Sequence, residues 1–138
     1  MSAINAIPVR AEYETGNVRP LLHEIRHALR SLQGGGEGTA IDLRSLPLAP
    51  GEERRIEEAL GVGEVRVELD ALGPSTITET SYPGVWLITH RNTENEVIGR
   101  LIEVTRVPAL LASQPEDIAA GLERLERDLD DGGQQGSN

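Results

Sequence analysis

Four short runs of residues that favour β-structure follow one another between residues 64 and 105, and they limit the fold more than any other feature of the chain. The first run, EVRVEL at 64–69, alternates aliphatic and charged residues, which is typical of a strand with one buried and one solvated face. The second is STITET at 75–80, the third is VWLITH at 85–90, and the fourth is IGRLIEVT at 98–105. Short polar or glycine-containing connections separate the runs, so their spacing predicts an antiparallel meander.

Two helices and a strand are predicted before these runs. Between residues 18 and 32, aliphatic side chains recur at steps of three and four, which is the spacing of one helical face. The apolar stripe of this helix runs through Val18, Leu22, Ile25 and Leu29. Pro20 falls in the first turn, where a missing amide hydrogen leaves no bond unmade, and the glycine-rich GGGEG at 34–38 ends the helix. A short strand, TAIDL at 39–43, follows. Residues 52–60 form a second helix with acidic residues in its first turn, as the helix dipole favours.

A third helix is predicted after the meander. Pro115 suits its first position, and its apolar stripe consists of Ile118, Leu122, Leu125 and Leu129. Together these elements predict an α+β fold, in which an antiparallel β-meander of four to five strands packs with two to three helices. We expect one such domain over residues 17–129, after a loosely ordered N-terminal segment at 1–16 and before a disordered polar tail at 130–138.

The composition limits the kind of core and the kind of partner. Apolar residues make up 38% of the 138-residue chain, but only 2% of residues are aromatic and none is phenylalanine, so the core must be aliphatic. The formal net charge of -10 argues against nucleic acids and anionic membranes, because binding phosphate groups requires clustered lysine and arginine. This charge favours a neutral or basic partner surface.

The chain contains no cysteine. Its absence excludes a disulfide framework, a thiol nucleophile and a cysteine-ligated zinc or iron–sulfur site, and we expect no cofactor. The first residues, MSAINAIPVRAEYE, lack the basic start and the long apolar stretch of a signal peptide. No apolar run approaches the length of about 18 residues that a membrane helix needs. We therefore expect a cytoplasmic protein without membrane insertion.

HEIRH at residues 23–27 matches the H-E-x-x-H pattern of zinc peptidases. The spacing of His23 and His27 places both imidazoles on one face of a helix. That face points about 160–200° away from the apolar stripe, and three arginines border it. A catalytic zinc needs a dry cavity and a third ligand, and nothing in the sequence marks one. The pattern favours a solvated helix face, and a zinc peptidase that uses His23, Glu24 and His27 is the alternative function.

Other patterns carry less chemistry. GGGEG runs from a helix into a strand, whereas phosphate-binding loops run from a strand into a helix, so a helix cap is the favoured interpretation. Glu79 and Glu103 lie on predicted strands, and although paired carboxylates perform acid–base catalysis, their positions favour the solvated face of a sheet. No G-x-S-x-G motif surrounds a serine. We predict no catalytic residue and no metal ligand.

ETSYPGVWLITH at residues 79–90 is the most distinctive stretch of the chain. Pro83 and Gly84 are typical of the centre of a type II turn, and they join two predicted strands. The turn places Tyr82 and Trp86, two of the three aromatic residues, on either side of it. Tyrosine and tryptophan frequently dominate the binding energy of protein interfaces. Trp86 is either the anchor of a contact or a core residue beneath one, and Tyr82 is a candidate for an exposed contact.

Several segments are distinctive in combination. They are LLHEIRHAL (21–29), IDLRSLPLAP (41–50), LGVGEV (60–65), ITETSYPGVWLITH (77–90) and IEVTRVPALLASQPEDI (102–118). They resemble the HupH/HyaF family of hydrogenase expression/formation proteins over residues 20–128, mainly the C-terminal domain of its longer members. Leu87 departs from the family pattern, because a second aromatic residue would be expected after the tryptophan. The first segment resembles the leading helix of that domain, which would explain HEIRH without zinc.

The resemblance implies a non-enzymatic, chaperone-like accessory protein in the maturation of a nickel–iron uptake hydrogenase. It implies binding to a hydrogenase structural subunit, with the immature iron–sulfur small subunit favoured, and contact with other maturation proteins. Because the chain has no thiolate with which to hold a cluster, it would assist by contact alone. The predicted contact residues are Glu79, Tyr82, Pro83, Gly84 and Trp86. A generic protein-interaction domain without a link to hydrogenase is the other alternative, and a homodimer is compatible with both.

Overall fold

A computed structural model describes residues 16–70 and 72–136 of the chain. Except for Gly16, the predicted loose segment at 1–16 lies outside the described residues. The chain divides into two compact units, Met1–Val107 and Pro108–Asn138. The first unit contains the predicted meander and the two helices that precede it, and the second contains the last helix.

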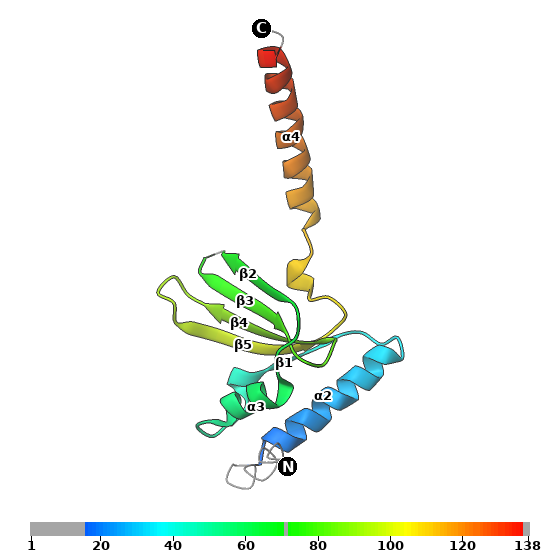
Figure 1. Ribbon diagram of the computed structural model, residues 1–138, viewed down its shortest axis with the longest axis vertical. Coiled ribbons are helices and arrows are strands. Elements are labelled where there is room, and N and C mark those ends of the chain that lie inside the picture. Colours follow the sequence, from blue (N-terminus) through cyan, green and yellow to red (C-terminus); the bar gives the residue numbers. More distant parts are fainter. Residues whose placement is uncertain (1–15, 71, 137–138) are drawn as a thin grey trace. The chain divides into compact units, whose positions relative to one another are not determined.

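The first unit is built on a five-stranded antiparallel sheet with the strand order β1-β5-β4-β3-β2. Its strands are β1 (Thr39–Asp42), β2 (Arg66–Asp70), β3 (Pro74–Glu79), β4 (Val85–Arg91) and β5 (Val97–Val104). Strands β2 to β5 form the predicted meander, and β1 pairs with the free edge of β5 (Figure 1). The predicted α+β class is therefore confirmed.

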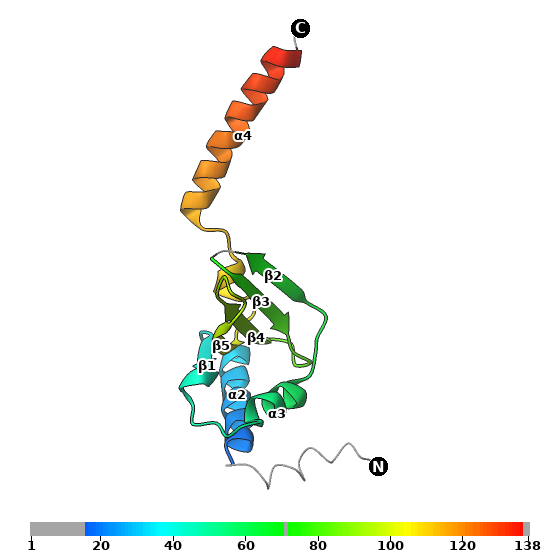
Figure 2. The same cartoon turned by 90° about the vertical axis from the view of Figure 1, so that its left-hand side faces the viewer.

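Two helices, α2 (Val18–Gln33) and α3 (Glu52–Leu60), cover one face of this sheet, as Figures 1 and 2 show. Side chains of β4 alternate between its two faces, so Val85 joins the cluster beneath the helices while Trp86 and Ile88 lie on the opposite face. Both faces contain buried residues, because Val85 is 0% exposed and Ile88 is 1% exposed. This explains why the run VWLITH is apolar at successive positions.

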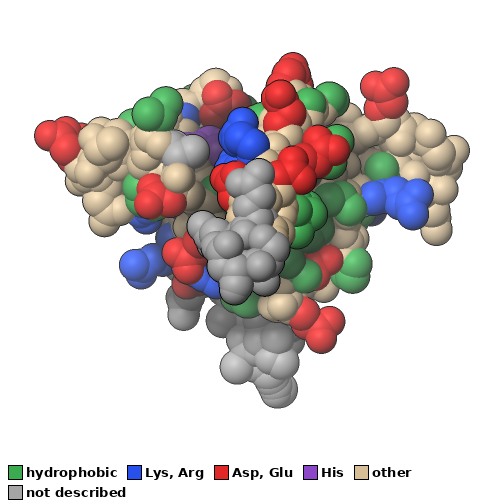
Figure 3. Space-filling model, turned by 90° about the horizontal axis from the view of Figure 1, so that it is seen from above, with side chains coloured by type: hydrophobic (Ala, Val, Ile, Leu, Met, Phe, Trp, Pro, Cys, Tyr) green, Lys and Arg blue, Asp and Glu red, His purple; other side chains and the backbone are tan. Residues whose placement is uncertain are grey.

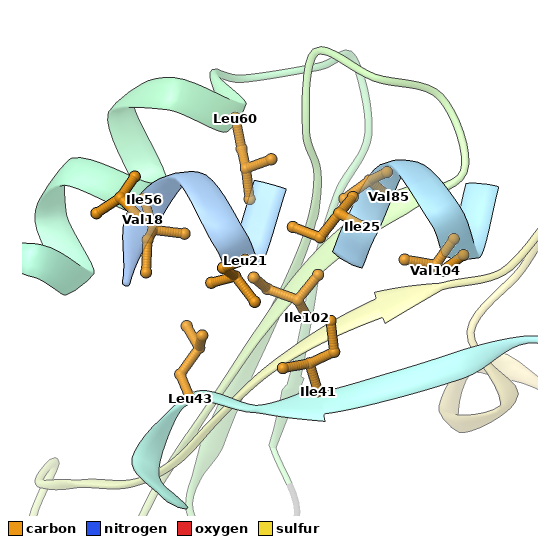
Figure 4. Close-up of a cluster of buried hydrophobic side chains, with 11 residues drawn as sticks. Val18, Leu21, Ile25, Ile41, Leu43, Ile56, Leu60, Val85, Ile102 and Val104 are labelled. Atoms are coloured by element: carbon orange, nitrogen blue, oxygen red, sulfur yellow. The ribbon is translucent and has the colours of Figure 1, made fainter. Parts of the chain in front are cut away.

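The main core lies between the helices and the sheet and is entirely aliphatic, as the composition predicts. Figure 4 shows side chains of α2 and α3 pointing toward those of β1, β4 and β5. Each fully buried aliphatic side chain contributes about 1.5–3 kcal/mol relative to an exposed one. The buried residues of the cluster are Val18, Leu21, Ile25, Ala28, Ile41, Leu43, Ile56, Leu60, Val85, Ile102 and Val104.

The buried side of α2 is rotated relative to the stripe predicted from the sequence. The spacing places Leu22 and Leu29 within that stripe, but both side chains are only partly buried, whereas Leu21 and Ala28 are buried. Helical periodicity alone does not decide between these pairs, because each is compatible with the three- and four-residue steps. The rotation leaves Leu22 and Leu29 at the edge of the core, where they border the molecular surface.

Glu52 is a buried carboxylate, 0% exposed, at the start of α3. Its Oε1 atom accepts a hydrogen bond of 2.8 Å from the backbone N–H of Ala49. The backbone N–H and the side-chain amide of Asn17, the residue before α2, each donate to this carboxylate at 3.3 Å. The Glu52 carboxylate therefore joins the beginnings of the two helices, which lie 35 residues apart in the chain.

The second unit contains a short 3-10 turn, η4 (Ala109–Leu111), and the helix α4 (Pro115–Gly136). The predicted stripe of α4 is exposed, with exposed fractions of 59% for Ile118, 56% for Leu122, 57% for Leu125 and 65% for Leu129. The helix continues to Gly136, past the boundary predicted between Leu129 and the tail at 130–138. Because extending an existing helix costs far less free energy than starting one, the polar residues after Leu129 do not end it.

The surface carries many carboxylates, in agreement with the net charge of -10. On the face in Figure 3, acidic side chains are spread among exposed hydrophobic ones. Within the described ranges, no helix combines the length and the apolar character required for crossing a bilayer.

Candidate protein-contact surface

The predicted turn between β3 and β4 is present and tightly bonded. The backbone N–H of Val85 donates to the carbonyl of Tyr82 at 2.9 Å, and Gly84 has a φ of 92°. A positive φ at this position is what a type II turn requires, and glycine adopts it without strain. Thr80, which is 2% exposed, accepts a hydrogen bond from the Tyr82 backbone N–H through its side-chain oxygen at 3.1 Å. The turn therefore has one defined conformation.

Residues at and just after the end of α3 form hydrogen bonds with the residues that precede this turn. The side-chain oxygen of Ser81 donates to the carbonyl of Leu60 at 2.6 Å, and the backbone N–H of Gly63 donates to the carbonyl of Glu79 at 2.8 Å. A Cβ atom on Gly63 would lie 2.3 Å from the carbonyl oxygen of Thr80, which is closer than two such atoms can approach. Glycine at position 63 therefore allows the LGVGEV segment to pass directly beneath the turn.

Tyr82 stands at the edge of an apolar groove of about 280 Å³. The groove lies between α2, the end of α3 and the turn, and its other lining residues are Leu22, Ile25, Arg26, Leu29, Ala59 and Leu60. The Tyr82 side chain is 50% exposed, so half of its surface is available to a partner. The expectation that Tyr82 is exposed at the turn agrees with this position.

Pro83 and Gly84 border a second groove of about 640 Å³. Glu79 and Arg106 also line it, so one acidic and one basic residue border the groove beside the turn. Leu29, Leu32 and Gln33, near the end of α2, also line this groove. Leu29 lines both grooves, which places them next to each other on the same surface.

Trp86 does not line either groove. Its side chain is 5% exposed, and its indole N–H donates to the carbonyl of Thr105 at 3.0 Å. The backbone N–H of Thr105 in turn donates to the carbonyl of Gly84 at 2.8 Å, so the indole is connected to the turn through one residue. Of the two roles considered for Trp86, the geometry favours support of the turn over direct contact with a partner.

The structure thus brings four predicted contact residues, Glu79, Tyr82, Pro83 and Gly84, to the lining of these grooves, while Trp86 is buried and connected to the turn through Thr105. Glu79 and Glu103 are both cross-strand partners of Trp86, so the indole separates these two carboxylates on the sheet. Sequence reasoning missed the α2 side of this surface, mainly Leu22, Arg26 and Leu29. The sequence signal for this side is the position of Leu22 and Leu29 next to the arginines of α2, which marks the boundary of the apolar stripe.

The three motif residues His23, Glu24 and His27 are exposed on α2. His90, the remaining histidine, lies on the sheet face opposite α2, where its Nδ1 atom is 2.8 Å from the side-chain oxygen of Ser75. His90 is therefore not placed to complete a metal site with His23 and His27. Across residues 16–70 and 72–136, no three histidine, cysteine, aspartate or glutamate side chains gather in a way that would hold a metal ion.

We predict that the protein binds no stoichiometric zinc. The imidazoles of His23 and His27 lie beside exposed Arg26, whose positive charge disfavours a divalent cation. Metal analysis of untagged protein after dialysis is expected to give well below one zinc per chain, with the same value for a His23→Ala/His27→Ala variant. Tightly held zinc at one ion per chain that is lost in the variant would establish the metal site instead.

Comparisons with known proteins give a consistent result. Residues 15–130 match the family described as "HupH hydrogenase expression protein, C-terminal conserved region". The chain is 33% identical over 114 residues to the hydrogenase expression/formation protein HoxQ of Azotobacter vinelandii, an alignment that covers 79% of this chain and 39% of that protein. It is 26% identical over 113 residues to HupH of Rhizobium leguminosarum bv. viciae, covering 82% of this chain and 40% of the relative.

A solved structure is similar over most of the chain. The hydrogenase expression protein HupH from Thiobacillus denitrificans ATCC 25259 superimposes with a TM-score of 0.81 at 44% sequence identity, covering 86% of this chain and 98% of that one. By contrast, the chain spans 39% to 40% of the length of the HoxQ and HupH relatives described above.

Proposed function

This chain belongs to the HupH family of hydrogenase expression proteins, in the region conserved at their C-termini, and from this we propose that it acts in the maturation of a nickel–iron uptake hydrogenase. It does so as a non-enzymatic, chaperone-like accessory protein in the cytoplasm. The observation that carries the proposal is the match of residues 15–130 to a family whose curated members are named hydrogenase expression/formation proteins.

The proposed partner is a hydrogenase structural subunit, with the immature iron–sulfur small subunit favoured over the large one. A chain without cysteine has no thiolate with which to ligate a cluster, so its role toward such a subunit is to hold or shield it. The surface around Tyr82, Pro83 and Gly84 supports this role, because it joins an exposed aromatic side chain to two grooves. Other maturation proteins are further partners.

The test is co-purification from a host that produces the hydrogenase. An affinity-tagged chain is expected to retain the small subunit from cells in which hydrogenase assembly is blocked, and deletion of its gene is expected to lower hydrogen uptake in air. The proposal fails if neither subunit is enriched and hydrogen uptake is unaffected by the deletion. Enrichment of an unrelated protein instead would favour the generic interaction domain.

Tyr82→Ala is expected to weaken capture of the subunit by about tenfold, because aromatic side chains at the centre of interfaces contribute most of the binding energy. Tyr82 is 50% exposed, so the change should leave the fold intact. The matched control is Ile98→Ala, which removes a 59% exposed hydrophobic side chain near the start of β5, at the opposite end of the sheet. If Tyr82→Ala captures the subunit as well as Ile98→Ala does, the turn is not part of the contact surface.

A further inference from the structure

The side of α2 that faces the turn forms one continuous surface. Four neighbouring depressions border it, and Leu22, Arg26 and Leu29 each line more than one of them. Tyr82 and Pro83 contribute the side formed by the β3–β4 turn. This surface, here named the α2 flank, lies entirely within residues 19–106 of the first unit.

The α2 flank has an apolar floor and a positive border. On a helical wheel, Leu22 and Leu29 lie within about 20° of each other, and the three arginines of α2 follow at about 60–100° from Leu29. Those arginines are Arg19, Arg26 and Arg30, and all three are exposed. Glu24, the acidic residue of α2, lies about 140° away on the other side of the helix. No carboxylate of α2 therefore faces these arginines from the flank.

The charge of the α2 flank is opposite to that of the protein as a whole. Among the described residues that line its four depressions, the basic side chains include Arg19, Arg26, Arg30 and Arg106, whereas the acidic one is Glu79. The whole chain has a formal net charge of -10. At about 0.1 M salt, charges more than about 10 Å away are largely screened, so a ligand on the flank is governed by these nearby arginines.

We propose that the α2 flank binds an acidic amphipathic segment, in which carboxylates stand beside a row of apolar side chains. The inference rests on the proposed function, since it assigns the chemistry of the segment by which the partner docks. The apolar row contacts Leu22, Leu29 and Tyr82, and the carboxylates pair with Arg26 and Arg30. Guanidinium groups bind carboxylates through two parallel hydrogen bonds, which fixes the orientation of the segment as well as its charge.

The test uses two synthetic helical peptides of about 15 residues. Both carry the same leucine stripe, with glutamate at the polar positions of one and lysine at those of the other. Isothermal titration calorimetry of the full chain at about 0.1 M NaCl is expected to show that the glutamate peptide binds about tenfold more tightly. Its affinity should fall as the salt concentration rises. Tighter binding of the lysine peptide would mean that the net charge governs, and no binding by either peptide would equally overturn the inference.

Charge reversal on the flank completes the test. Arg26→Glu/Arg30→Glu is expected to abolish or invert the preference for the glutamate peptide, and both residues are exposed, so the fold should be retained. The matched control is Arg54→Glu on α3, an exposed position that lines none of the four depressions. A preference that survives the double variant, or is lost equally in the control, would place the peptide elsewhere.

The outcomes separate this inference from the function on which it rests. If the chain captures a hydrogenase subunit but shows no preference between the peptides, the chemistry assigned to the docking segment is wrong and the maturation role stands. If the peptide preference is present but neither subunit is captured and deletion of the gene leaves hydrogen uptake unchanged, the surface is an acidic-segment binding site and the maturation role fails.

Discussion

Trp86→Ala is expected to lower the free energy of unfolding by about 3–5 kcal/mol, the largest effect of any single substitution considered for this protein. The indole is 5% exposed, so truncation to alanine removes a large buried ring and leaves a cavity in its place. The substitution also removes the hydrogen bond of 3.0 Å to the carbonyl of Thr105. Since small domains are stable by about 5–15 kcal/mol, this loss is a substantial fraction of the total. Urea denaturation followed by circular dichroism measures it.

The control for this variant comes from the same turn. Tyr82→Ala removes a half-exposed aromatic side chain, and it is expected to cost less than about 1 kcal/mol in stability. We thus expect Trp86 to contribute mainly to stability and Tyr82 mainly to contact with the partner. If Trp86→Ala unfolds at the same urea concentration as the wild type but no longer captures the hydrogenase subunit, Trp86 is itself the contact anchor and its assignment as a supporting residue is wrong.

Glu52→Ala is expected to lower the free energy of unfolding by about 2–4 kcal/mol, because it leaves partly buried amide donors without their carboxylate acceptor. The carboxylate is 0% exposed and accepts from Ala49 at 2.8 Å and from Asn17 at 3.3 Å. Its loss removes the connection between the beginnings of α2 and α3, so we expect thermal unfolding at a lower temperature in a single cooperative step.

Glu58→Ala on the same helix is the matched control. Glu58 is exposed, and truncation there should change the free energy of unfolding by less than about 0.5 kcal/mol. Glu52→Gln keeps the shape of the side chain and one carbonyl acceptor, so its cost should fall between those of the other two variants. Equal stability of Glu52→Ala and Glu58→Ala would show that the buried carboxylate contributes nothing to the union of the helices.

Local features of the fold could be predicted because they depend on neighbouring residues. The sequence predicts the helix at 52–60 with its observed bounds, because acidic residues begin it and glycine follows it. The turn at Pro83 and Gly84 followed from the φ angles that these two residues favour. Strand boundaries differ by one or two residues, as for β2, which was predicted at 64–69 and occupies Arg66–Asp70.

Features that depend on packing between distant segments could not be predicted. The face of β4 to which Trp86 belongs was undecided, because VWLITH is apolar on both faces and the pattern gives no preference. Glu52 was interpreted as a residue that favours the helix dipole, and its bonds to Asn17 depend on a contact across 35 residues. The net charge of -10 predicted a neutral or basic partner, whereas the α2 flank collects arginines that the total charge conceals.

The position of Trp86 gives the protein an internal optical reporter. It is the one tryptophan of the chain, so excitation near the red edge of indole absorption selects a single site. Because the ring is 5% exposed, its fluorescence emission should be blue-shifted in the native state. Because the ring is connected through Thr105 to Gly84, the emission should also change when a partner binds at the turn. Partner binding and global unfolding can then be followed in the same unlabelled sample, at concentrations well below those that calorimetry needs.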